Sequence, residues 1–171
     1  SDYTAIVGQT VNFSAGGSAT AVVNVAVNGD SVLEANETFA VNLSNPSGGS
    51  IADGQGIGTI NNDDSASIAI NDVAITEGNS GSSNANFTVT LTGAVQGGFT
   101  LPVSSSNGTA TAGFDYSAIA GGTNVSFSGT AGETRTVSVA VNGDNVVEAN
   151  ETFNVLLGTP SNAQIRVRDT S

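Results

Sequence analysis

The side chains of this chain best suited to chemistry are carboxylates, and they occur in a phrase that the sequence contains twice. The phrase begins Val-Asn-Gly-Asp and ends Asn-Glu-Thr-Phe, at 27–39 and again at 141–153. Its acids are Asp30, Glu34 and Glu37 in the first copy, and Asp144, Glu148 and Glu151 in the second. Clustered carboxylates without basic neighbours are typical of sites for a hard cation, and irregular loop oxygens suit Ca²⁺. Calcium is therefore the first hypothesis for what the chain binds.

The charge balance narrows the classes of partner. The chain has 15 acids against three Arg residues, no Lys, and a net charge of −12. Nucleic acids and anionic membrane surfaces both favour positive charge, so we expect neither as a partner. Cys and His are absent, which excludes thiol and imidazole chemistry, the usual zinc sites and a catalytic triad built on either residue. The apolar runs are too short to span a bilayer, so we expect no membrane insertion of this segment.

The composition favours a location outside the cell. Gly, Ser, Thr, Asn, Ala and Val dominate the chain, and charge is low apart from the acids. Seven Asn-x-Ser/Thr triplets occur, but a chain so rich in these residues produces them by chance, and glycosylation is left open. We expect an extracellular or cell-surface protein.

Apolar residues alternate with small or polar ones along most of the chain. Val23, Val25 and Val27 show this period of two, as do the runs that begin at Phe39 and Phe87. Alternation of this kind predicts half-buried strands, and no window of helical period competes with it. We expect strands near 10–13, 20–28, 38–44, 57–61, 67–71, 86–92 and 99–105. Short strands separated by turns rich in Gly, Asn and Ser predict an antiparallel β-sandwich.

The repeat sets the expected module boundaries. The second copy of the phrase begins 114 residues after the first (141 against 27), so the repeated unit has the size of a domain. In this frame residues 1–64 form the back half of a first module. Residues 65–171 form a second module that ends before an equivalent of the last strand of the first. We expect a fragment of a longer array, or a subunit whose missing strands come from neighbouring chains.

Counting strand directions indicates where the acids lie. Successive antiparallel strands reverse direction, so each connection falls at a known end of the sandwich. This count places Asp2, Asp63 and Asp64 at the same end as the first acidic phrase. It places Glu77 and Asp115 at the same end as the second. Like charges about 4 Å apart repel by roughly 1 kcal/mol in water and roughly 4 kcal/mol at an effective dielectric of 20, so such a group needs a cation. The alternative is a solvated acidic rim that serves solubility alone.

Several further motifs resemble the Calx-beta domain, a calcium-binding β-sandwich. They are Ile-Thr-Glu-Gly-Asn-Ser-Gly at 75–81, Gly-Thr-Ala-Thr-Ala-Gly-Phe-Asp-Tyr at 108–116, Leu-Ser-Asn-Pro-Ser at 43–47 and Gly-Thr-Ile-Asn-Asn-Asp-Asp at 58–64, together with the two acidic phrases. The resemblance covers essentially the whole chain. It implies tandem immunoglobulin-like antiparallel β-sandwich modules.

The resemblance also implies a set of calcium ligands. In the first module these are Asp2, Asp30, Glu34, Glu37, Asp63 and Asp64; in the second they are Glu77, Asp115, Asp144, Glu148 and Glu151. Gly29 and Gly143 stand where exchanger-type domains have a further Asp, and Asn62 stands where their closing run of Asp begins. We therefore expect one or two ions in a complete module.

The leading functional hypothesis is a structural or adhesive repeat of a long extracellular protein, with Ca²⁺ rigidifying the array. Its expected partners are neighbouring modules or identical chains, including a fibre assembled by strand exchange; the sequence identifies no adhesion ligand. The alternative is a regulatory calcium sensor of exchanger type. A cadherin-like adhesin fits the repeated phrase less well. An enzyme is not expected, because carboxylate-based glycosidases need aromatic platforms and this chain has no Trp.

Overall fold

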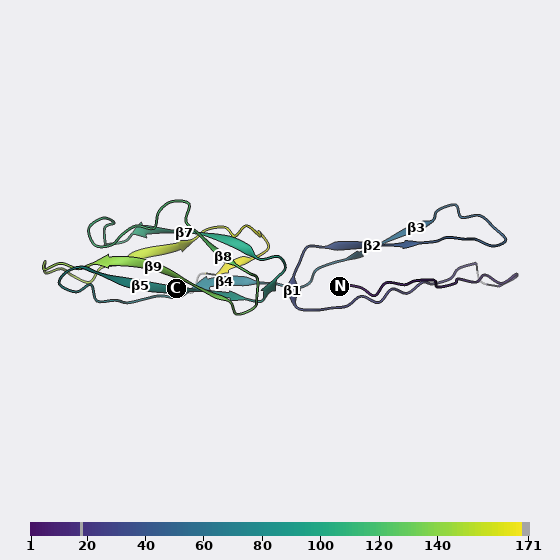
Figure 1. Cartoon of the computed structure of the whole chain (residues 1–171), viewed down its shortest axis with the longest axis horizontal. Coiled ribbons are helices and arrows are strands. Elements are labelled where there is room, and N and C mark those ends of the chain that lie inside the picture. Colours follow the sequence, from purple (N-terminus) through teal and green to yellow (C-terminus); the bar gives the residue numbers. More distant parts are fainter. Residues whose placement is uncertain (18, 169–171) are drawn as a thin grey trace. The chain divides into compact units, whose positions relative to one another are not determined.

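The computed structural model describes residues 1–17 and 19–168, and it contains strands and no helices in that part of the chain (Figure 1). No helix of the described residues is long and apolar enough to cross a membrane. The chain divides into two compact units. Unit 1 comprises Ser1–Asp30 and Ala35–Asn62, and unit 2 comprises Ser31–Glu34 and Asp63–Ser171.

Unit 2 is a β-sandwich built from two sheets. One sheet has the order β11 (Arg166–Arg168), β4 (Ser67–Ile70), β5 (Ser82–Thr92) and β9 (Thr134–Asn142). The other has the order β10 (Phe153–Leu157), β7 (Phe99–Asn107) and β8 (Asn124–Phe127). This arrangement confirms the all-β sandwich, and β4, β5 and β7 lie where the alternating pattern predicted strands.

The alternation of apolar and polar residues along the strands explains the core of unit 2. Alternate residues of β5 and β7 point between the sheets, and Val89, Leu91 and Leu101 are all fully buried there. Val139 of β9 completes the same layer, with 1% of its surface exposed. Alternation in the sequence therefore becomes a continuous apolar layer between two sheets.

Two of the pairings differ from the all-antiparallel expectation. β11 runs parallel to β4, and β1 (Val32–Leu33) runs parallel to β6 (Ala94–Val95). The second pairing buries Leu33, and the backbone N–H of Gln96 donates to the Leu33 carbonyl at 3.1 Å. The middle of the first acidic phrase is thus part of unit 2, although the rest of the phrase belongs to unit 1.

Unit 1 has strands but no core. β2 (Glu37–Asn42) and β3 (Gln55–Ile60) form an antiparallel pair, and an isolated bridge joins Tyr3 to Val27. None of its described residues is buried. The predicted strands at 10–13 and 20–28 are wrong apart from that bridge. The counterpart of 20–28 in unit 2 is β9, which pairs along its length with β5, whereas among the described residues of unit 1 the segment 20–28 pairs only through the bridge to Tyr3.

Candidate metal site

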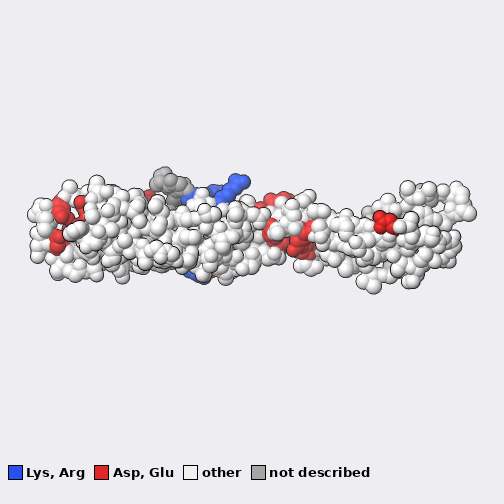
Figure 2. Space-filling view, turned by 90° about the horizontal axis from the view of Figure 1, so that it is seen from above, with Lys and Arg blue, Asp and Glu red and all other residues white. Residues whose placement is uncertain are grey.

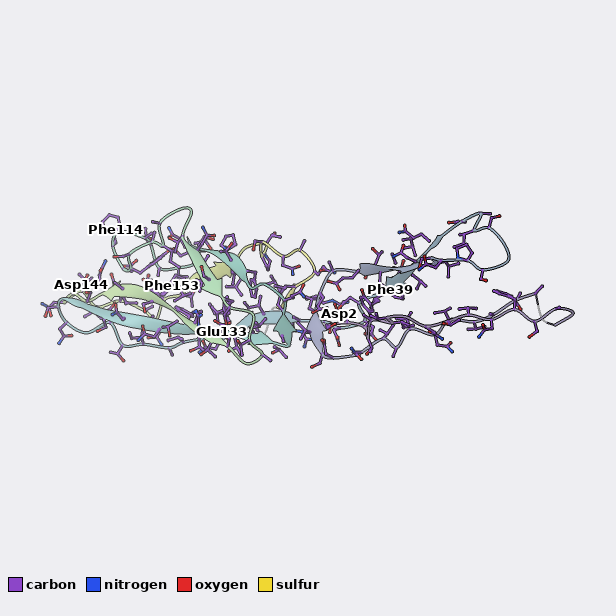
Figure 3. The ribbon with its side chains drawn as sticks, turned by 45° about the vertical axis from the view of Figure 1, so that its right-hand side comes forward. Asp2, Phe39, Phe114, Glu133, Asp144 and Phe153 are labelled. Carbon is purple, nitrogen blue, oxygen red and sulfur yellow. The ribbon has the colours of Figure 1, made fainter. Side chains whose placement is uncertain are left out.

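The predicted acids of the second module come together at one end of unit 2. β7 and β9 end there, while β5 and β10 begin there, so the connections that carry the acids must meet. Acidic side chains gather at this end in Figure 2, and Figure 3 places Asp144 and Phe114 in the same region. The direction of the strands therefore decides the position of the site.

Three carboxylates form the centre of this group. One carboxylate oxygen from each of Asp115, Glu148 and Glu151 lies within 4.8 Å of the others. Asp115 is half-buried and the two Glu side chains are exposed. Oxygens bound to opposite sides of one Ca²⁺ ion are up to about 5 Å apart, because Ca–O bonds are about 2.3–2.6 Å long. The spacing and the donor type fit one calcium ion with open positions for water or carbonyl oxygens.

Asp115 is held by its backbone and by its neighbour in the sequence. Its carboxylate accepts a hydrogen bond from the Thr111 N–H at 2.7 Å, and its carbonyl accepts one from the Asn142 N–H at 2.9 Å. Tyr116 is 1% exposed and donates its hydroxyl to Oδ1 of Asn107 at 2.8 Å. The Tyr116 ring also stacks on Phe153, with centroids 4.4 Å apart. A buried anchor thus presents the carboxylate at the surface.

The electrostatics of the group are those of crowded negative charge. Desolvation raises the pKa of Glu148, and the charges of Asp144, Asp115, Glu151 and Glu77 raise it further. Desolvation also raises the pKa of Glu151, followed by the charge of Asp115 and a hydrogen bond with it. The charged side chains that cause these two shifts are all acidic. A divalent cation would relieve this repulsion.

Glu77 and Asp144 lie outside the three-carboxylate centre and act on it through their charge. Oδ1 of Asp144 accepts the Val146 N–H at 2.7 Å, which closes a turn of the Asx type and leaves the second oxygen for other contacts. The turn holds Asp144 close enough to raise the pKa of Glu148. Both residues are thus placed at the rim of the site.

Gly143 allows two loops to pack closely at the site. A Cβ atom at this position would lie 2.7 Å from the carbonyl oxygens of both Glu77 and Gly78. The Gly143 N–H also donates to the Gly81 carbonyl at 2.9 Å. The lack of a side chain lets the 77–81 loop approach the second acidic phrase. Gly143 therefore brings Glu77 towards the site, although it supplies no carboxylate of its own.

The predicted ligands of the first module are divided between the units. In unit 1, carboxylate oxygens of Asp2 and Asp30 lie within 4.8 Å of each other. A hydrogen bond with the Glu37 side chain lowers the pKa of Asp2. The other three predicted ligands, Glu34, Asp63 and Asp64, belong to unit 2. Within that unit, Oε1 of Glu34 accepts a hydrogen bond from Nε2 of Gln96 at 3.1 Å.

Sequence reasoning missed the residues that support the site. Asn107 accepts hydrogen bonds from the Tyr116 hydroxyl and from the Ala112 N–H, at 2.8 Å and 3.0 Å, and so ties the end of β7 to the Asp115 loop. The sequence around Asn107 gives no indication that its side chain accepts a hydrogen bond from a buried Tyr. The repeat of Asp-Tyr at 2–3 and 115–116 was the available signal that the Tyr is structural.

The fold and the acidic end together define a β-sandwich module with a site suited to a divalent cation. The family model of the Calx-beta domain matches two overlapping segments, residues 1–74 and 61–170. The chain therefore belongs to the Calx-beta domain family, as its motifs indicated. It is also similar to the crystal structure of CBD12 from CALX1.2, with 26% sequence identity and a TM-score of 0.43 over 80% of this chain. This chain spans 53% of the length of that one. No curated protein matches the sequence.

Proposed function

We propose that this chain is a calcium-binding structural repeat of an extracellular or cell-surface protein. The observation that carries the proposal is the group formed by Asp115, Glu148 and Glu151, whose carboxylate oxygens lie within 4.8 Å of one another. Membership of the Calx-beta family and the excess of acids over bases support calcium as the ion. The proposal assigns no catalytic role to the chain.

The ion would act as a cross-link between loops. Asp115 follows β7, whereas Glu148 and Glu151 lie in the connection from β9 to β10. An ion bound by all three residues would join connections from both sheets. Without the ion, carboxylates with raised pKa values repel one another at neutral pH. Calcium would therefore stiffen this end of the sandwich, which is the property needed in a repeat that serves as a spacer or a support.

The expected affinity follows from the ligand set. Three carboxylates, two of them exposed, form an open site, and extracellular calcium modules commonly have Kd values of about 10⁻⁴–10⁻³ M. At a free calcium concentration of about 100 times Kd, binding stabilises the folded state by about 2.7 kcal/mol. An extracellular protein meets calcium at concentrations that suit such a site.

A thermal melt of the chain in calcium, in magnesium and in a chelator tests the proposal. We expect a rise in Tm with calcium that is absent with magnesium. Glu151→Gln should abolish the rise, whereas Asp72→Asn, which removes a charge outside the group, should preserve it. A calcium-induced rise that survives in Glu151→Gln would place the ion elsewhere, and no rise with the unaltered chain would leave a solvated acidic rim.

The alternative function, a regulatory calcium sensor, requires tighter calcium binding than a structural repeat does. Calcium sensors work with Kd values of about 10⁻⁷–10⁻⁵ M. Family membership fits both roles equally well. A titration that gives a Kd in the micromolar range would favour the sensor, and one near the millimolar range would favour the structural repeat.

A further inference from the structure

Glu133 carries a nearly buried carboxylate at the end of unit 2 opposite the acidic end. It directly precedes β9, whereas Asp144 follows that strand, and Figure 3 shows the two residues well apart. The Glu133 side chain is 9% exposed and forms an ion pair with Arg135. Acids are seldom this well covered unless their charge is paired or hydrogen-bonded. The partners of Glu133 therefore indicate what its charge does.

The Glu133 carboxylate holds the connection from β8 to β9, which we call the 128–133 turn. Oε2 accepts hydrogen bonds from the Ser128 N–H at 2.8 Å, the Ser128 hydroxyl at 2.9 Å and the Gly129 N–H at 3.1 Å. The backbone of Glu133 is fixed separately, because its carbonyl accepts the Leu91 N–H of β5 at 2.9 Å. The Glu133 side chain therefore ties the start of the turn to the sheet that contains β5.

The same turn supports β6. The Gly129 carbonyl accepts the Val95 N–H at 2.8 Å. The two segments lie so close that a Cβ atom at Gly129 would overlap the Val95 carbonyl oxygen, and the φ of Gly129 is +94°, which favours glycine. In the described part of the chain, β6 pairs with one other strand, β1. The turn is thus the support of β6 on the side away from β1.

β6 in turn binds the tip of the first acidic phrase. Successive N–H groups of an extended strand point to opposite sides. The Val95 N–H points to the turn, and the next one, that of Gln96, donates to the Leu33 carbonyl at 3.1 Å. Leu33 is 3% exposed, and the Gln96 side chain donates to Oε1 of Glu34 at 3.1 Å. β6 therefore lies between the turn that Glu133 organises and the tip of the phrase.

We propose that Glu133 is a positioning residue that fastens Ser31–Glu34, the tip of the first acidic phrase, to unit 2. The carboxylate holds the 128–133 turn, the turn supports β6, and β6 binds Leu33. β1 and β6 have two residues each, and so short a pairing opens more readily than the long β5–β9 ladder. Loss of the Glu133 charge therefore frees the tip while the two sheets of unit 2 remain folded. This role goes beyond the proposed function, because the contact needs no calcium.

Acid is one way to remove this charge. The Ser128 backbone N–H lowers the pKa of Glu133 below the ordinary 4.5, and the positive charge of Arg135 lowers it further. The stability that Glu133 contributes is therefore present above pH 4.5 and is lost as the pH falls through the lowered value. Arg135 is the charged group that faces Glu133 from β9. Glu34 places a second acid at the pairing of β1 with β6, so it needs a control of its own.

Native-state hydrogen exchange of the full chain in a chelator tests the role of Glu133. The Gln96 N–H reports the pairing of β1 with β6, and the Val139 N–H reports the β5–β9 ladder. In the natural chain at neutral pH, Gln96 should open at a lower free energy than Val139. Glu133→Gln should lower the protection of Gln96 about tenfold, as expected for the loss of a hydrogen bond to a charged group. Equal opening free energies for Gln96 and Val139, or unchanged protection of Gln96 in Glu133→Gln, would overturn the proposal.

The pH profile of the same exchange separates this role from a general contribution to stability. In the natural chain, the protection of Gln96 should fall as the pH is lowered from 4.5. Glu133→Gln already lacks the charge and should show no such fall, whereas the control Glu34→Gln should keep the profile of the natural chain. A fall that persists in Glu133→Gln, or that disappears in Glu34→Gln, would assign the titration to another group and overturn the proposal. Because these measurements contain no calcium, their failure would reject the role of Glu133 alone.

Discussion

Replacing Tyr116 by Phe removes one hydroxyl group from beneath the acidic site and leaves the ring in place. The Tyr116 ring is 1% exposed, and its hydroxyl donates to Asn107, which still accepts the Ala112 N–H after the change. No acceptor is orphaned, so the cost should be that of one hydrogen bond, about 1 kcal/mol. For a unit of about 110 residues this corresponds to a fall in Tm of about 4 °C. Calcium affinity should be unchanged, because the hydrogen bonds to Asp115 remain.

Tyr116→Ala removes the anchor itself. Truncation of a buried aromatic residue costs about 3–5 kcal/mol, and the stacking on Phe153 is lost as well. Calcium affinity should then fall together with stability. The assay is urea unfolding of each variant, with calcium titration of the folded protein. Tyr3→Phe is the matched control, because the equivalent ring lies in a unit with no buried described residue and should give no measurable change. Loss of calcium binding in Tyr116→Phe, or its retention at full affinity in Tyr116→Ala, would refute the anchoring role.

The remaining predictions concern loop packing and pH. Gly143→Ala should destabilise unit 2 by about 1–3 kcal/mol, because its Cβ atom would meet two carbonyl oxygens, whereas Gly29→Ala has open space and should be neutral in the same urea assay. Partial desolvation and neighbouring acids raise the pKa values of Glu148 and Glu151 above the ordinary 4.5. Without calcium, the stability that these two groups contribute is therefore present below pH 4.5 and is lost as the pH rises through the raised values. Calcium needs the charged forms, so its apparent affinity should fall as the pH falls through the same range, as calorimetry at several pH values will measure.

The pH prediction needs a control for the rest of the unit. The Ser128 backbone N–H lowers the pKa of Glu133, so the stability contributed by Glu133 is present above pH 4.5 and lost as the pH falls below that value. At each pH, the free energy of unfolding of a chain carrying Glu148→Gln and Glu151→Gln is subtracted from that of the natural chain. The contribution of Glu133 is the same in both chains and cancels. A difference that is independent of pH would contradict the assigned cause of the raised pKa values.

Much of unit 2 can be predicted from the sequence, because the apolar residues that alternate along its strands are the ones that are buried. Phe87, Val89 and Leu91 alternate in the sequence and lie in the core, since a strand with one buried face must have period two. The meeting of Asp115 with Glu148 was predictable in kind, since it follows from strand direction alone. Both arguments use local periodicity and chain reversal, which a single sequence contains.

Other features depend on contacts that leave no local signal. Val23 and Val25 alternate as well as their counterparts in β9 do, but a strand also needs a partner, and no strand among the described residues of unit 1 pairs with them as β5 pairs with β9. The pairing of β1 with β6, which places Glu34 beside Gln96, is a two-residue contact between distant segments. The role of Gly143 depends on how closely the 77–81 loop approaches it, which is a matter of packing and not of residue type.

The most direct test of the central claim is a calorimetric titration of the full chain with calcium, beside the same titration with magnesium. We predict saturable calcium binding near the millimolar range and weak or no heat with magnesium. In the chain carrying Glu148→Gln and Glu151→Gln, the calcium signal from unit 2 should be lost. Equal responses to the two ions, or calcium binding unchanged by the double substitution, would contradict the assignment of Asp115, Glu148 and Glu151 as a calcium site.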